Sequence, residues 1–84
     1  MPEIWAEGGF TFVIFLNDHE PAHVHVFSGR PRSGASTLRI VLHNRHVVPD
    51  RIPSSWTDAQ VRRALRIAAD HYEAFLEAWS RFHR

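Results

Sequence analysis

The chain has 84 residues, 44% of them hydrophobic and 12% aromatic, a composition that indicates one globular domain over residues 1–84 and excludes a disordered chain. It contains no cysteine, which excludes disulfides and thiolate metal sites. Its formal charge of +1 is too small to indicate nucleic-acid binding by itself. No apolar stretch approaches the roughly 20 residues of a membrane span, and the N-terminus lacks the pattern of a secretory signal. We therefore expect a cytoplasmic protein with no membrane association.

Alternating apolar and polar residues in the N-terminal half predict an antiparallel β-meander of four to five strands. Gly8-Gly9 and Asn44-Arg45 are two-residue hairpin signals between such stretches. A loop rich in turn-forming residues and carrying two arginines covers residues 28–36. The expected strands span about 3–6, 10–16, 23–27, 37–43 and 46–48, with Pro49 ending the last one.

A helix is predicted at the C-terminal end, and its first turn is well specified. Thr57 and Gln60 have the spacing of a capping box, in which each side chain bonds the other residue's backbone N–H. Apolar residues then recur at alternating spacings of four and three, which places them on one side of a helix. They are Val61, Leu65, Ala68, Tyr72, Phe75, Trp79 and Phe82. We expect one long helix over about 58–81, packed on one sheet face, and hence an α+β fold.

Residues 18–26, Asp-His-Glu-Pro-Ala-His-Val-His-Val, form the most informative segment of the chain. Successive strand side chains point to opposite faces, so His23 and His25 share one face and Val24 and Val26 the other. The helix is expected to cover the more apolar face, made of Phe10, Phe12, Ile14, Leu16, Val24, Val26, Leu38, Ile40 and Leu42. The second face then holds Val13, Phe15, His23, His25, Phe27, Arg39, Val41 and His43. With a single helix, we expect nothing in the chain to cover this second face, and an open patch of this kind typically contacts a partner.

Four functions are compatible with that second face. In the first, Phe15 and Phe27 stack on unpaired RNA bases while arginines bind phosphates. The arginine and histidine contacts for RNA or a partner protein would be Arg30, Arg32, Arg39 and His43. In the second, His23 and His25 act as general acid and base of a ribonuclease, with Arg39 stabilising the charge of the transition state.

The third function is binding of zinc or another divalent metal ion by His19, His23 and His25, with Asp18 or Glu20 as a further ligand. In the fourth, the imidazoles form a polar layer in the interface of a homodimer or of a complex with a partner protein. The residue types alone do not choose among the four.

Two segments, GGFTFVIFLNDHEPAHVHV and PSSWTDAQVRRALRIAADHYEAFLEAW, resemble a family of short bacterial proteins catalogued as a domain of unknown function. The shared pattern is an aromatic strand, an acidic residue followed by His-x-Pro-x-His-x-His, further strands and a closing helix with a late tryptophan. Its positions in this chain are Asp18, His19, Pro21, His23, His25 and Trp79. The chain departs from the pattern at Ala22, where a second proline is usual, and in the length of its arginine-bearing loop.

This resemblance implies that the protein is one component of a toxin–antitoxin-like or regulatory two-gene pair. We therefore expect a small interaction module that binds a protein encoded nearby, or RNA, through its open sheet face and needs no cofactor. Ribonuclease activity and divalent-metal binding are the alternatives.

Overall fold

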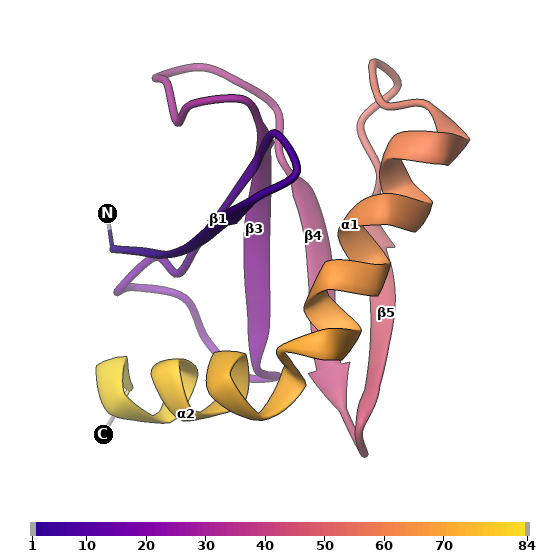
Figure 1. Cartoon of the computed structure of the whole chain (residues 1–84). Coiled ribbons are helices and arrows are strands. Elements are labelled where there is room, and N and C mark those ends of the chain that lie inside the picture. Colours follow the sequence, from indigo (N-terminus) through magenta and orange to yellow (C-terminus); the bar gives the residue numbers. More distant parts are fainter. Residues whose placement is uncertain (1, 84) are drawn as a thin grey trace.

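The computed structural model describes residues 2–83 as a five-stranded antiparallel sheet with two helices (Figure 1). The strands lie in the sheet in chain order, so every neighbouring pair is joined by a direct connection. They are β1 (Glu3–Glu7), β2 (Phe10–Val13), β3 (His23–Ser28), β4 (Leu38–His43) and β5 (His46–Arg51). The helices are α1 (Asp58–Asp70) and α2 (Tyr72–Phe82). The predicted α+β class and antiparallel meander are confirmed.

Both predicted two-residue hairpins are present. Gly8 and Gly9 have φ of 62° and 84°, and Asn44 and Arg45 have φ of 51° and 66°. Positive φ at both central residues is what a type I′ turn requires, and this turn matches the twist of the strands that it joins. The local sequence therefore sets the β1–β2 and β4–β5 connections.

Two strand ends differ from the prediction by more than one residue. β2 ends at Val13, which pairs with His25 of β3, and the chain leaves the sheet beyond Ile14. Leu16 consequently lies outside the sheet with 60% of its surface exposed, so its predicted place on the helix-covered face is wrong. β5 continues through Pro49 to Arg51, because an edge strand tolerates the missing N–H where its register with β4 shifts.

The helix begins as predicted but is broken. Thr57 Oγ1 accepts a hydrogen bond from the Gln60 N–H, and Gln60 Oε1 accepts one from the Thr57 N–H. His71 then adopts φ −115° and ψ 24°, which separates α1 from α2, so the prediction of one continuous helix is wrong. The His71 ring lies 4.1 Å from that of Trp5, and its Nε2 is 3.3 Å from Glu7 Oε1. The break therefore coincides with contacts to β1, and not with a proline or a glycine.

The break sends the two helices to different parts of the sheet. α1 lies across β4 and β5, whereas α2 turns away and crosses near the start of β3 (Figure 1). Within residues 2–83, neither helix combines the length and apolar character that crossing a membrane requires.

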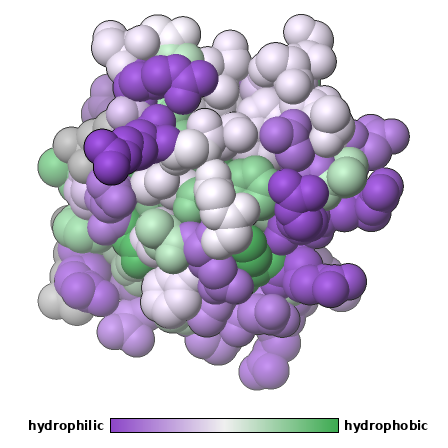
Figure 2. All heavy atoms as spheres, turned by 45° about the horizontal axis from the view of Figure 1, so that its top comes forward, coloured by the Kyte–Doolittle hydropathy of each residue, from purple (hydrophilic) through white to green (hydrophobic). Residues whose placement is uncertain are grey.

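The core lies between the helices and the sheet face predicted to be apolar. Its buried members include Phe10, Phe12, Ile14, Val24, Val26, Leu38, Ile40 and Leu42 from the sheet and Val61, Ala68, Phe75 and Trp79 from the helices. On the molecular face in Figure 2, hydrophobic side chains (green) show mainly in recesses between hydrophilic ones (purple). Apart from Leu16, the sheet residues predicted to lie on the helix-covered face are confirmed as members of the core.

The second sheet face is much less open than predicted. Val13, His23 and Phe27 are exposed by only 0%, 2% and 4%. The reason is that the β2–β3 connection folds back over β3, so that Asp18 contacts both strand histidines and the Phe15 ring lies 4.6 Å from that of His25. The β2–β3 connection, together with Trp79 of α2 against His23, thus covers part of this face, and the expectation of a wholly open face is wrong.

Candidate metal centre

Three side chains converge where the β2–β3 connection folds over β3. His23 and His25 are two residues apart on β3 and project to the same face, while Asp18 reaches them from the connection. Asp18 Oδ2 lies 3.1 Å from His23 Nε2 and 3.2 Å from His25 Nε2. One ligand atom from each residue lies within 4.8 Å of the others. This is a two-histidine, one-carboxylate cluster.

The three converging atoms are buried and poorly aligned for hydrogen bonds with one another. Asp18 Oδ2, His23 Nε2 and His25 Nε2 are all inaccessible to solvent, and apart from their contacts with one another they have no polar partner among the described residues. A buried polar atom without a partner costs about 1–3 kcal/mol. Three such atoms at one point indicate that a species between them is needed to satisfy them.

The tautomer of His23 supports the presence of a proton or a cation between these atoms. Its Nδ1 is 2.8 Å from the Pro21 carbonyl oxygen, which can only accept a hydrogen bond, so Nδ1 carries the hydrogen. In the neutral ring, Nε2 then presents its lone pair to a carboxylate oxygen 3.1 Å away. Two electron-rich atoms at this separation repel each other unless a proton or a cation lies between them.

His25 is held in a similar way and is kept neutral by its surroundings. Its Nδ1 lies 3.1 Å from the Thr37 hydroxyl, which fixes the ring and leaves Nε2 directed at Asp18. Burial lowers the pKa of His25 below 6.5, and the attraction of the Asp18 carboxylate opposes this shift without cancelling it. A neutral imidazole is the form that binds a metal ion.

Two of the three separations match those of a coordination shell, and all three atoms lie within 4.8 Å of one another. Bonds of about 2.0–2.1 Å from zinc to nitrogen or oxygen place neighbouring ligand atoms about 3.3 Å apart in a tetrahedron. The two distances from Asp18 Oδ2 to the imidazole nitrogens are 3.1 and 3.2 Å. The Pro21 carbonyl and the Thr37 hydroxyl occupy the positions of the outer groups that orient metal-binding histidines.

Aromatic side chains enclose the cluster. The Trp79 ring of α2 lies 4.9 Å from that of His23, and its Nε1 donates a hydrogen bond to Glu20 Oε1 at 3.3 Å. Phe15 lies against His25 on another side. The break at His71 is what directs α2, and with it Trp79, to the start of β3 (Figure 1).

The other residues predicted as metal ligands lie apart from the cluster. His19 is exposed, and the Glu20 carboxylate bonds Trp79. Asp18, which the sequence suggested only as a further ligand, occupies the centre instead. Thr37 and Trp79 were not identified as site residues, although Trp79 belongs to the pattern that carries the family resemblance.

The remaining predicted site residues are distributed around the second face. Arg39 pairs in register with His25, but its Nε lies 2.9 Å from Asp50 Oδ2. His43 is exposed at the far end of β4 and contacts Asn44. Arg30 and Arg32 are exposed on the β3–β4 loop, Phe15 is half-buried and Phe27 is buried. Phe27 therefore has little ring surface to offer an RNA base.

These observations define a small α+β domain that carries a partly buried two-histidine, one-carboxylate cluster on one strand and the connection before it. The family model described as Domain of unknown function (DUF4160) matches residues 9–80, and the chain belongs to this family. The matched range contains the whole cluster and Trp79. No curated protein and no solved structure matches the chain.

Proposed function

We propose that this protein binds a divalent transition-metal ion, with zinc as the first choice, through Asp18 Oδ2, His23 Nε2 and His25 Nε2. The observation that carries the proposal is the convergence of three buried ligand atoms within 4.8 Å of one another, with Asp18 Oδ2 3.1 and 3.2 Å from the two imidazole nitrogens. Imidazole and carboxylate ligands suit zinc, iron, cobalt and nickel.

Three protein ligands leave room for water or a substrate atom, and a divalent ion held in this way acts as a Lewis acid. The chain's own residues would orient the two imidazoles and exclude bulk water from them. The geometry favours this role for His23 over contact with RNA, since a ring that is 2% exposed has almost no surface to offer a substrate.

Metal titration of the chain, prepared without a purification tag, tests the proposal. We expect the metal-free protein to bind one equivalent of zinc or cobalt and to unfold at a higher temperature when it is loaded. His25→Gln should lose stoichiometric binding, whereas His43→Gln, which alters an exposed histidine outside the cluster, should bind like the wild type. Absence of stoichiometric binding, or equal binding by both variants, would show that the cluster is not a metal site.

We further propose a partner protein encoded nearby, as the family resemblance implies, and place its contact at the edge strand β5. Val48 and Ile52 expose 48% and 52% of their surface on or next to this strand, which has β4 as its one neighbour in the sheet that residues 2–83 form. An edge strand with exposed apolar side chains is a typical site of association.

Co-expression with the product of the adjacent reading frame tests this second proposal. We expect a complex that co-purifies with the wild type and with Leu16→Glu, but not with Val48→Glu. Leu16 is a suitable control because it is also exposed, at 60%, and lies away from β5. If no complex forms, or if both variants behave alike, the proposed partner contact at β5 is wrong.

A further inference from the structure

A cavity of about 460 Å³ adjoins the cluster on the second sheet face. Its lining comes from β3 and from the loops before and after it, and includes Phe15, His25, Phe27, Arg32, Ala35 and Thr37. Its volume falls within the range of pockets that hold small organic ligands. His25, one of the proposed metal ligands, belongs to this lining, and so does Thr37, whose hydroxyl contacts the His25 ring.

The lining changes in character along β3. At one end, His25, Thr37 and Phe15 lie together. Phe27 follows two residues further along β3 on the same face, which is roughly 7 Å at the rise of a strand. Beyond it, Arg32 lies near the end of the strand, where its guanidinium donates a long hydrogen bond of 3.5 Å to the Ser28 carbonyl oxygen. The cavity thus has an imidazole end, an aromatic middle and a cationic end.

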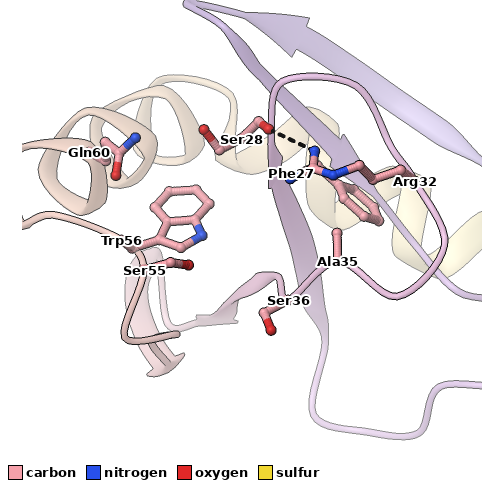
Figure 3. Close-up of a pocket in the computed structure, with 8 residues that line it drawn as sticks. All are labelled: Phe27, Ser28, Arg32, Ala35, Ser36, Ser55, Trp56 and Gln60. Carbon is pink, nitrogen blue, oxygen red and sulfur yellow. Dashed lines mark hydrogen bonds between the residues drawn. The ribbon is translucent and has the colours of Figure 1, made fainter.

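Arg32 is available to bind an anion. Its weak bond to Ser28 is its one hydrogen bond in the described part of the chain, and no carboxylate there forms an ion pair with it. Figure 3 shows its side chain and that of Phe27 in the wall of a second, smaller cavity of about 260 Å³ that reaches Trp56 and Gln60. Arg32, Phe27 and Ala35 line both cavities, so the guanidinium lies at the boundary between them.

We propose that the larger cavity binds a small planar organic anion. Its carboxylate or phosphate group pairs with Arg32, its flat apolar body packs against the half-buried Phe15 ring, and its other end faces His25. A guanidinium forms paired hydrogen bonds with either anionic group, and aromatic side chains favour a flat partner. The last part of this assignment rests on the proposed metal centre, because a ligand end next to His25 would lie beside the bound ion.

Titration of the whole chain with benzoate, phenyl phosphate and uncharged benzamide tests the assignment, with and without one equivalent of zinc. We expect at least one of the two anions to bind the wild type about tenfold more tightly than benzamide does. Which anion binds more tightly identifies the acidic group that the cavity prefers. Arg32→Gln should remove the tenfold preference, and Ala35→Leu should weaken all binding by filling the cavity. Arg30→Gln, which alters an exposed arginine of the same loop outside this lining, should have no effect.

The outcomes separate this inference from the metal proposal. If zinc binds and neither anion does, or if Arg30→Gln and Arg32→Gln reduce binding equally, the cavity assignment is overturned and the metal centre stands. If zinc does not bind but the anions still depend on Arg32, the cavity assignment stands without its metal-facing end. Equal binding of benzamide and both anions would overturn the role of Arg32 whatever the metal content.

Discussion

Replacement of Phe75 by alanine should lower the free energy of unfolding by about 3–5 kcal/mol. Phe75 is 1% exposed, and its ring centroid lies 5.2 Å from that of Phe12, which is itself fully buried. Alanine would leave a cavity between α2 and the sheet. A chain of this size has a total stability on the order of 4–13 kcal/mol, so the loss is a large fraction of it.

Urea unfolding followed by circular dichroism measures this effect, and Phe82→Ala is the matched control. Phe82 belongs to the same helix but is 36% exposed, so its loss should be at most about half as large. Similar losses for the two variants would mean that the contact between α2 and the sheet does not depend on Phe75. Because α2 also carries Trp79 to His23, a folded Phe75→Ala protein should bind metal more weakly than the wild type.

The fold could be predicted where the determinants are local. Val24 and Val26 face the core because side chains alternate along a strand, and Thr57 begins a helix because its hydroxyl reaches the Gln60 N–H. The hairpins follow in the same way from residues that tolerate positive φ. In each of these cases the interactions that determine the local structure lie within a few neighbouring residues.

The break at His71 could not be predicted, because its causes are distant in sequence. Leu65, Tyr72 and Phe75 continue one apolar stripe, and no proline or glycine interrupts it. The contacts at the break are with Trp5 and Glu7, on the opposite end of the chain. The direction of α2, and therefore the burial of His23 under Trp79, follows from those tertiary contacts.

The sequence located the candidate site on His23 and His25, but it did not predict which other side chain reaches them. The alternation of His23 and His25 correctly placed both rings on one face. The path of the chain from Ile14 to Ala22 then decides which carboxylate or imidazole reaches them. This path could not be predicted, because a loop has no regular repeat in its sequence. For this reason Asp18 occupies the centre, whereas His19, its neighbour, is exposed.

Exchange of Asp18 for asparagine should weaken metal binding by about 100-fold or more while leaving the metal-free fold nearly as stable. Loss of a group that only orients a ligand costs about 10–100-fold in affinity, and Asp18 is proposed to be a ligand itself. The amide has almost the same shape as the carboxylate, but it is uncharged and a poor ligand for transition metals. Its N–H can also donate to an imidazole lone pair, which removes the repulsion in the metal-free protein.

Competition with a chromophoric chelator gives the zinc affinity, and thermal unfolding with and without zinc gives the linked stability. Glu20→Gln is the control, since it removes the same charge two residues away and keeps an amide oxygen to accept the Trp79 hydrogen bond. We expect it to bind zinc within a few-fold of the wild type. If Asp18→Asn binds zinc as tightly as Glu20→Gln, Asp18 is not a ligand. The difference between these two variants therefore decides whether Asp18 binds the metal or only forms polar contacts that hold the β2–β3 connection over β3.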